Sequence, residues 1–142
     1  QNEKVATNSG AIKVITNFWK SKGLNVNQLF LYDGSGLSPM NAVSAQFITD
    51  LLTYMFTTSK NKTDFIHSLA VSGDQGTLKS FLANTPLEGK VYAKSGTIAR
   101  VKSYAGYIKQ EDKTYAFAIL VNNIRSSKAV QHRIEKLLLS IQ

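Results

Sequence analysis

The hydrophobic pattern of this chain changes its period at Pro86. Before Pro86, apolar side chains recur at the three- to four-residue spacing of one helix face. After it, they follow a period of two, as in strands. A sequence with helices first and strands afterwards favours an α+β fold, in which a small antiparallel sheet packs against helices.

Two strong helices are predicted before the period changes. Residues 10–22 carry an apolar stripe, and Gly23 is a natural C-terminal stop. Ser44 is placed to cap the second helix. Further short helices are expected at 63–70 and 76–83. The stripes are formed by Val14, Ile15, Phe18 and Trp19 in the first helix and by Phe47, Ile48, Leu51, Leu52, Met55 and Phe56 in the second.

Three strands are predicted in the second half, at 90–95, 101–109 and 114–122. A polar four-residue loop, Gln110 to Lys113, predicts a hairpin between the last two. The third strand is apolar on both faces, so we expect it to be central in the sheet and covered on both sides. A closing helix would lie on the sheet through a stripe formed by Val130, Ile134, Leu137, Leu138 and Ile141.

Length and composition indicate one ordinary domain. The chain has 142 residues, of which 43% are hydrophobic and 18% charged, a balance typical of a globular protein. No apolar run approaches the roughly 20 residues that a membrane span needs, so no span is predicted. The N-terminal residues 1–10 are polar and show no apolar signal region.

The residue types that bind metals are scarce. Cysteine is absent, which excludes disulfides, thiol nucleophiles and thiolate metal sites. The two histidines, His67 and His132, lie far apart in sequence, and no carboxylate cluster accompanies either. We therefore expect no metal site and no cofactor.

The chain is basic, with 17 Lys and Arg against 9 Asp and Glu, a net charge of +8. Such a charge suits an anionic partner, either nucleic acid or an anionic cell-wall polymer. The basic residues are spread along the whole chain, without a basic run or an RNA-binding motif. A solvated basic surface is therefore favoured and no nucleic-acid partner is expected, with a nucleic-acid-binding domain kept as an alternative.

The sequence "AKSGT" at residues 93–97, here called the lysine segment, places polar residues in an apolar strand. In an extended strand, Lys94 and Gly96 point to one face and Ser95 and Thr97 to the other. Because Gly96 lacks a side chain, an extended peptide could pair with the strand there. The ammonium and hydroxyl groups would suit a terminal carboxylate. The structural alternative is a tight turn with a snorkelling lysine.

The sequence "DGSGLSPMN" at residues 33–41, here called the serine loop, precedes the second helix. Its candidate functional residues are Ser38 and Asn41. In the structural alternative, Ser38 caps a helical turn that Pro39 begins, and Asn41 bonds to the local backbone.

Together and in this order, the two segments resemble the Ser/Asn and Lys-Thr-Gly-Thr elements of the type-four penicillin-binding proteins, a family of serine D-Ala-D-Ala carboxypeptidases and endopeptidases. "SGDQGTL", residues 72–78, is similar to the family's Gly-Asp-Gly-Thr-Leu segment, and "SYAGYI", residues 103–108, to its Ala-Gly-Tyr strand. The resemblance implies part of a β-lactamase/transpeptidase-like fold.

The resemblance also implies an acyl-serine mechanism, in which a serine attacks the carbonyl of D-Ala-D-Ala and the terminal D-Ala leaves. Ser38 would relay a proton to the leaving nitrogen. Asn41 would hold a substrate peptide group. Lys94 would raise the local positive potential and help to poise Ser38.

The remaining residues of the lysine segment would bind substrate. The resemblance implies that the Ser95 and Thr97 hydroxyls bind the terminal carboxylate, and Gly96, which has no Cβ, would let the substrate backbone lie against the strand. The Thr97 N–H would form half of the oxyanion hole. The implied partners are peptidoglycan stem peptides ending in D-Ala-D-Ala, β-lactams and an N-terminal part of the same protein. The implied compartment is the periplasm or another extracytoplasmic part of the bacterial cell envelope.

The sequence departs from the family pattern in three places. Ser95 replaces the commoner threonine and keeps its hydroxyl. Pro39 and Met40 stand where the family often has an arginine and a variable residue. Asn41 follows Ser38 by three positions, whereas the shorter form of the family's element is Ser-x-Asn. The alignment of Asn41 with the asparagine of that form is therefore left open.

The family's nucleophilic Ser-x-x-Lys element has no counterpart at a matching place in this sequence. The single Ser-x-x-Lys match, Ser59 to Lys62, lies between the other two elements in a polar stretch. We expect an exposed loop there, remote from Lys94. The chain is therefore expected to be one incomplete DD-peptidase domain over 1–142, the C-terminal portion of that enzyme. Its mainly helical part would be 1–86 and its sheet and last helix 87–142. A non-catalytic cell-wall binding module is the alternative.

Overall fold

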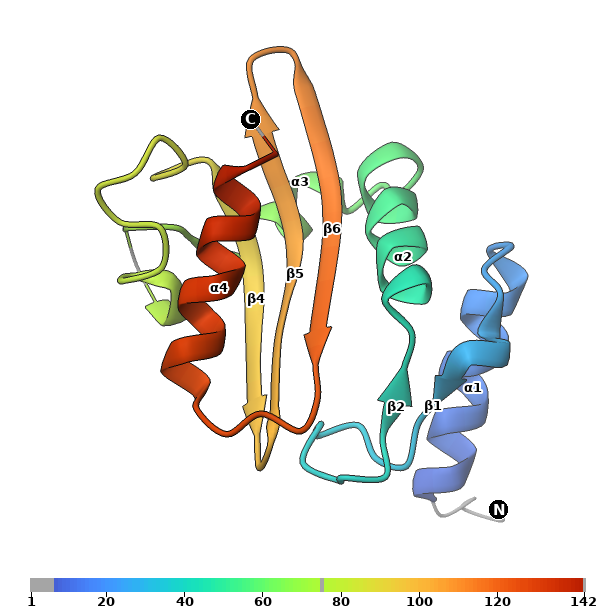
Figure 1. The fold of residues 1–142 in the computed structure, drawn as a ribbon. Coiled ribbons are helices and arrows are strands. Elements are labelled where there is room, and N and C mark those ends of the chain that lie inside the picture. Colours follow the sequence, from blue (N-terminus) through green and yellow to red (C-terminus); the bar gives the residue numbers. More distant parts are fainter. Residues whose placement is uncertain (1–6, 75, 142) are drawn as a thin grey trace, which may run out of the picture.

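The computed structural model describes residues 7–74 and 76–141 (Figure 1). Its helices are α1 (Asn8–Ser21), α2 (Ala45–Thr57), α3 (Lys62–His67) and α4 (Ser127–Leu139), with short 3-10 helices at Val26–Gln28 and Gly76–Leu78. Its strands are β1 (Leu29–Phe30), β2 (Ala42–Val43), β3 (Ala70–Val71), β4 (Val91–Ile98), β5 (Val101–Gln110) and β6 (Lys113–Val121).

An antiparallel four-stranded sheet of order β3-β4-β5-β6 forms the centre of the structure, and β1 and β2 pair separately. Figure 1 shows α4 across the front of the sheet and α3 behind it. Helices come first in the chain, and the C-terminal helix packs on the sheet. The predicted α+β class is therefore confirmed.

Each face of the sheet covers its own hydrophobic cluster. The cluster beneath α4 consists of Leu78, Phe81, Leu82, Leu87, Val91, Ala93, Tyr104, Ile108, Ile134 and Leu138. On the other face, Leu52 and Ile66 pack with Tyr107, whose hydroxyl donates to the Leu52 carbonyl at 2.7 Å. Because neighbouring strand residues alternate between the faces, β5 contributes Tyr104 to one cluster and Tyr107 to the other.

The helix boundaries follow local capping chemistry. The Ser44 hydroxyl accepts a hydrogen bond from the Phe47 N–H at 3.0 Å, which begins α2 where the sequence predicted. The Ser126 hydroxyl begins α4 in the same way by accepting from the Ala129 N–H at 3.3 Å. These caps fix the first residues of α2 and α4, which pack on opposite faces of the sheet through Leu52 and through Ile134 and Leu138.

The prediction of a helix at 76–83 is wrong beyond one 3-10 turn, Gly76–Leu78. Leu78, Phe81 and Leu82 are buried in the cluster beneath α4, and Leu82 has a positive φ of 57°. A left-handed residue interrupts a right-handed helix. The backbone conformation of this segment is therefore decided by burial of these side chains in the core and not by their helix-like spacing in the sequence.

Two predictions about the last strands are corrected. The β5–β6 pairing continues to Gln110 opposite Lys113, so the hairpin turn has two residues rather than four. Within the described residues, β6 is an edge strand and not a central one. Its two apolar faces have another cause, since Phe117 packs against the cluster beneath α4 and Ala116 against the cluster on the other face.

Some predicted apolar stripes are only partly covered. In α4, Ile134 and Leu138 are buried, whereas Leu137 and Ile141 are each 51% exposed. In α1 no residue is buried, and Trp19 meets α2 through an edge-to-face contact with Tyr54 at 5.9 Å between ring centroids.

Candidate active site

The lysine segment lies on an edge of the sheet that β3 leaves open. On one side, β4 pairs with β5 along its whole length. On the other side, it pairs with β3 only at Tyr92 and Ala93. Within the described residues, β4 therefore has no strand partner on that side from Lys94 to Ile98.

The main-chain groups of Ser95 and Thr97 point toward this open edge. The β4–β5 register is continuous, so alternate residues of β4 direct their N–H and C=O groups to the same side. The Val91 carbonyl accepts from the Ser72 N–H at 2.9 Å on the β3 side. Ser95 and Thr97 follow Val91 by an even number of positions, so their N–H and C=O groups point to the same side of β4 as those of Val91. Their N–H groups are thus presented to a ligand at the open edge.

The side chains of the lysine segment divide between the two faces, as strand alternation predicts. Val91 and Ala93 are buried beneath α4, so Ser95 and Thr97 face that side. Lys94 and Gly96 face the side of α2 and α3. A peptide lying along the open edge would therefore meet polar groups from both faces.

Lys94 turns back toward the open edge. Its side chain is exposed, and Nζ donates to the Ser95 carbonyl at 2.9 Å. Since that carbonyl points to the open edge, the ammonium group lies there too. A positive charge consequently stands beside the outward N–H groups of the segment.

Gly96 lies close to the neighbouring strand. A Cβ at this position would come within 2.6 Å of the Ser103 hydroxyl on β5. The absence of a side chain therefore lets Ser103 keep its position, in addition to leaving the strand edge uncovered.

Lys102 is a polar residue of this region that the sequence analysis missed. It lies on β5 directly opposite Thr97, and its Nζ donates to the Thr97 hydroxyl at 3.0 Å. Counting back from the β4–β5 turn would have identified the pair. That turn, Ala99–Arg100, lacks the Gly or Asn that marks such hairpins, and Ala99 adopts a positive φ of 45°.

The serine loop is held by Asp33 and Asn41. The Asn41 Oδ1 accepts from the Tyr32 and Asp33 N–H groups at 2.7 and 3.2 Å, and its Nδ2 donates to Asp33 Oδ1 at 2.9 Å. Asp33 also accepts from the N–H groups of Gly36 and Ser38 at 2.8 and 2.9 Å. The Asn41 amide thus organises the loop, and its role toward substrate stays a prediction.

These bonds favour the ionised form of Asp33. The hydrogen bond from the Asn41 side chain lowers the pKa of Asp33 from its ordinary value of 3.8, and the Gly36 and Ser38 N–H groups add to the effect against an opposing contribution from burial. A carboxylate therefore sits at the centre of the loop near neutral pH.

Ser38 closes a turn within this loop. Its hydroxyl oxygen accepts from the Met40 N–H at 3.1 Å, and its carbonyl accepts from the Asn41 N–H at 3.2 Å. Among the hydrogen bonds of the described residues, none uses the Ser38 hydroxyl proton. That proton is therefore available to an acceptor from outside the loop.

The serine loop and the lysine segment are each organised locally. No hydrogen bond joins the two in the part of the chain that the structure describes. Figure 1 places the loop between β1 and β2 and the turn after β4 at the same end of the molecule. Their convergence on one cleft stays a prediction.

Ser59 to Asn61 lie in the connection between α2 and α3, as expected, whereas the lysine of the Ser-x-x-Lys match, Lys62, is the first residue of α3. The expectation of an exposed serine is wrong. Ser59 is half-buried and lines a groove formed by α1, α2 and the residues leading into α3. Its hydroxyl accepts from the Asn61 N–H at 3.2 Å, which turns the chain between the two helices.

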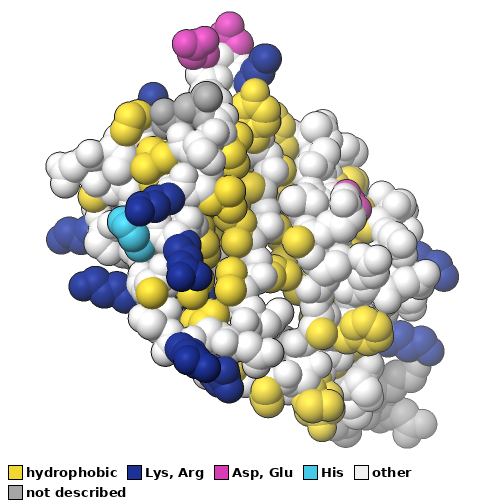
Figure 2. All heavy atoms as spheres, in the orientation of Figure 1, with side chains coloured by type: hydrophobic (Ala, Val, Ile, Leu, Met, Phe, Trp, Pro, Cys, Tyr) yellow, Lys and Arg dark blue, Asp and Glu magenta, His cyan; other side chains and the backbone are white. Residues whose placement is uncertain are grey.

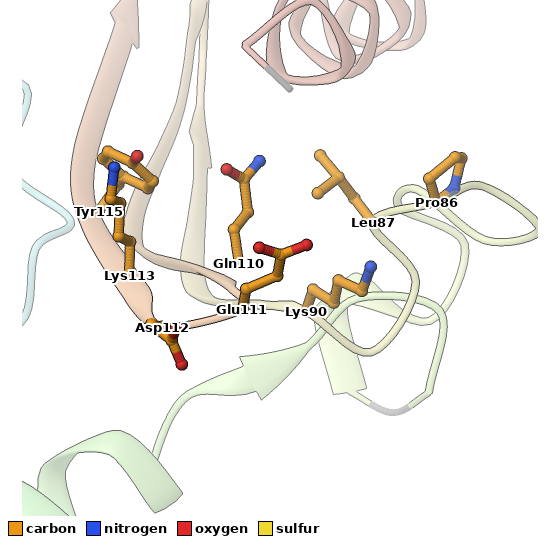
Figure 3. Close-up of a pocket in the computed structure, with 8 residues that line it drawn as sticks. All are labelled: Pro86, Leu87, Lys90, Gln110, Glu111, Asp112, Lys113 and Tyr115. Atoms are coloured by element: carbon orange, nitrogen blue, oxygen red, sulfur yellow. The ribbon is translucent and has the colours of Figure 1, made fainter.

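A separate hollow of about 440 Å³ lies beyond the start of β4 (Figure 3). Its lining comes from the segment before β4 and from the β5–β6 hairpin, and consists of Pro86, Leu87, Lys90, Gln110, Glu111, Asp112, Lys113 and Tyr115. None of the predicted site residues lines it. The hairpin and the turn after β4 lie at opposite ends of the sheet.

Folding gathers part of the dispersed basic charge. Figure 2 shows Lys and Arg side chains over and below α4, where Lys128, Arg133 and Lys136 are exposed. In the described ranges no helix is long and apolar enough to cross a membrane. Residues 7–74 and 76–141 also contain no cluster of three His, Cys, Asp or Glu side chains suited to a metal ion.

Comparison with known proteins places this geometry in a family. Residues 1–141 match the D-Ala-D-Ala carboxypeptidase 3 (S13) family. A D-alanyl-D-alanine carboxypeptidase from Actinomadura sp. (strain R39) is 38% identical over 112 residues, which cover 75% of this chain and 20% of that protein. The chain spans about a fifth of the length of the curated relatives it matches.

Solved structures share the fold. Penicillin binding protein 4 (dacB) from Haemophilus influenzae, in complex with a β-lactam, has a TM-score of 0.86 at 20% identity, covering 99% of this chain and 35% of that one. A penicillin-G-acylated predatory endopeptidase from Bdellovibrio bacteriovorus has a TM-score of 0.74 at 14% identity, covering 91% and 38%. The predicted resemblance, including the transpeptidase-like fold, is thereby confirmed.

Proposed function

The chain belongs to the D-Ala-D-Ala carboxypeptidase 3 (S13) family, and from this premise we propose that it is the C-terminal portion of a serine-type D-Ala-D-Ala carboxypeptidase or endopeptidase. We refer to that longer protein as the parent protein. Its substrates are peptidoglycan stem peptides ending in D-Ala-D-Ala, and it binds β-lactams. Because peptidoglycan lies outside the cytoplasmic membrane, the parent protein is periplasmic or otherwise extracytoplasmic.

The observation that carries the proposal is the open edge of β4. From Lys94 to Ile98 this edge has a main chain without a strand partner within the described residues, together with two hydroxyls and an ammonium group. An extended peptide can add to such an edge through main-chain hydrogen bonds. A terminal carboxylate would then lie near the hydroxyls of Ser95 and Thr97.

The reaction is an acyl transfer in two steps. A serine hydroxyl of the parent protein, outside this sequence, attacks the carbonyl carbon of the penultimate D-Ala. The C–N bond breaks, the nitrogen takes up a proton relayed by Ser38, and D-Ala leaves. Water then hydrolyses the acyl ester and frees the serine.

In this reaction, the residues of this chain bind the substrate and stabilise the charge that develops at the reacting carbonyl. The outward N–H of Thr97 donates to the carbonyl oxygen as it becomes an oxyanion, a charge that appears only in the transition state. Lys94 raises the positive potential at the reacting centre and helps to poise Ser38. The Asn41 amide, through the donor hydrogen that Asp33 leaves free, holds a substrate peptide group.

Exposed apolar side chains support packing against an N-terminal part of the parent protein. Val14 and Phe18 on α1 are 69% and 49% exposed, and Leu37 and Met40 in the serine loop are 74% and 66% exposed. Clusters of exposed apolar side chains mark interaction surfaces. Such packing would bring the nucleophile toward the serine loop.

Labelled penicillin tests the proposal. The parent protein is expected to form a stoichiometric acyl adduct on a serine outside residues 1–142, located by peptide mass mapping, and to release D-alanine from a D-Ala-D-Ala peptide. The 142-residue chain alone is expected to form no adduct. A parent protein without any adduct would favour a non-catalytic cell-wall binding module. An adduct on Ser38 or Ser59 would show that the nucleophile lies within this chain, which contradicts the proposal of a nucleophilic serine outside residues 1–142.

A further inference from the structure

The hydrogen bond between Lys102 and Thr97 lies where the proposed substrate carboxylate would bind. Lys102 stands on β5 directly opposite Thr97 and shares its face of the sheet. The distance from Lys102 Nζ to Thr97 Oγ1 is 3.0 Å. The proposed chemistry gives a role to Thr97 but none to this lysine.

The direction of this bond is fixed by chemistry. A lysine ammonium has three donors and no acceptor, so the Thr97 oxygen must accept. The hydroxyl hydrogen of Thr97 is then directed elsewhere, and no acceptor for it lies among residues 7–74 and 76–141. Because Thr97 is exposed at the open edge, that hydrogen is free to be donated to a ligand.

The ammonium group is held in place by a rigid aromatic side chain. Lys102 Nζ lies 5.1 Å from the centre of the Tyr104 ring, within range of a cation–π interaction. Tyr104 is 1% exposed and stacks on Phe81 with 4.4 Å between ring centroids. Its hydroxyl donates to Gln131 Oε1 at 3.2 Å. The charge beside Thr97 therefore has a defined position.

A hydroxyl that accepts from a cation becomes a better donor, because hydrogen bonds in a chain polarise one another. The same cation attracts an anion that binds to the hydroxyl, and charge-assisted bonds are stronger than neutral ones. A carboxylate at Thr97 would benefit from both effects. A ligand whose carboxylate is esterified would gain little from either.

We propose that Lys102 is a positioning residue that sets the affinity of the parent protein for ligands with a free terminal carboxylate, acting through the hydroxyl of Thr97. This inference rests on the proposed function, since it assigns the carboxylate to the Thr97 hydroxyl. Lys102 takes no part in the covalent steps.

Acylation kinetics of the parent protein test this role with two probes, a penicillin and its methyl ester. In Lys102→Met the second-order acylation rate constant for the free acid is expected to fall about tenfold, the size of a charged hydrogen bond. The change should appear as a higher dissociation constant of the initial non-covalent complex, while the limiting rate constant of acylation changes little. The rate constant for the ester should stay within about twofold.

Matched variants separate this effect from a structural one. Lys109→Met removes another lysine of β5, whose Nζ lies 4.0 Å from the Tyr92 ring centre, and should change neither probe. Lys102→Arg should keep most of the acylation rate constant for the free acid that Lys102→Met loses. In a Thr97→Val background, Lys102→Met should have a clearly smaller effect, because the hydroxyl is gone and only the direct attraction between the ammonium group and the carboxylate is left.

The outcomes distinguish the two proposals. If the unaltered parent protein is not acylated, the proposed function fails and this inference fails with it. If the parent protein is acylated but Lys102→Met lowers the rates for acid and ester equally, or lowers neither, only the role of Lys102 is overturned. A loss confined to the free acid and clearly reduced in the Thr97→Val background supports it.

Discussion

Asn41 and Asp33 hold the serine loop together from within: Asn41 Nδ2 donates to Asp33 Oδ1 at 2.9 Å, while Asn41 Oδ1 accepts from the Asp33 N–H at 3.2 Å. The same carboxylate accepts from the Ser38 N–H at 2.9 Å. The position of Ser38 therefore depends on a charged group that can be titrated.

The ionisation of Asp33 should couple the order of this loop to pH. Its folded pKa is lowered, so its contribution to stability is fully present above the ordinary value of 3.8 and is lost as the pH falls through the folded pKa. A titration of the Asp33 carboxyl carbon by NMR should give a midpoint below 3.8, with the Ser38 amide signal moving over the same range.

Asn41→Ala provides the control for this titration. Because the bond from Asn41 is the largest cause of the shift, its removal should move the Asp33 midpoint back up toward the ordinary value. A midpoint at or above 3.8 in the unaltered protein would show that the loop bonds do not favour the carboxylate.

Lys94→Ala should abolish much of the acylation of the parent protein while leaving its fold intact. The Lys94 side chain is exposed and bonds only to its neighbour's carbonyl among the described residues, so its loss costs little packing. Removal of one preorganised charge from a transition state lowers rates by about 100-fold. Acylation by labelled penicillin and the unfolding temperature are the two measurements.

Lys90→Ala is the matched change at the other end of β4, where the side chain is also exposed. It should leave both measurements unaltered. Equal acylation rates for Lys94→Ala and the unaltered protein would mean that Lys94 has a structural role alone.

Gly106→Ala should destabilise the sheet. A Cβ at Gly106 would lie 2.0 Å from the Tyr92 carbonyl oxygen and 2.6 Å from Ala93 Cα, and neither backbone atom can move without shifting β4. Overpacking of this kind costs about 1–3 kcal/mol or more. Urea unfolding of the parent protein should show the loss.

Gly34→Ala serves as the comparison, because a Cβ there meets nothing within 4 Å. It should change the free energy of unfolding by less than about 0.5 kcal/mol. An equally small effect of Gly106→Ala would contradict the close approach of β4 to β5.

Tyr107→Phe should weaken the attachment of α2 to the sheet. The Tyr107 hydroxyl donates to the Leu52 carbonyl at 2.7 Å, and burial raises the pKa of Tyr107 to about 12. The loss of this buried hydrogen bond should cost about 1–2 kcal/mol of unfolding free energy. Tyr115→Phe, on an exposed ring, should cost almost nothing, and similar values for the two would argue against the bond.

Local chemistry made several features of the fold predictable from the sequence. The Ser44 cap, the start of α2 and the alternation of β4 depend on neighbours within a few positions, and each was located correctly. The lysine segment and the serine loop were identified from short motifs for the same reason. Their residue types and order were enough to indicate the family.

Long-range packing decided the rest. Whether β6 lies at the edge or the centre depends on which strands pair with it, and its own apolar faces do not specify that. Burial of Leu78 and Phe81 beneath α4 replaced a predicted helix by a 3-10 turn. The sequence by itself determined which polar groups stand in the lysine segment. Only the tertiary structure decided that Lys102 bonds to Thr97 across the sheet, because strand register depends on pairing between segments and not on the spacing of residues within one of them.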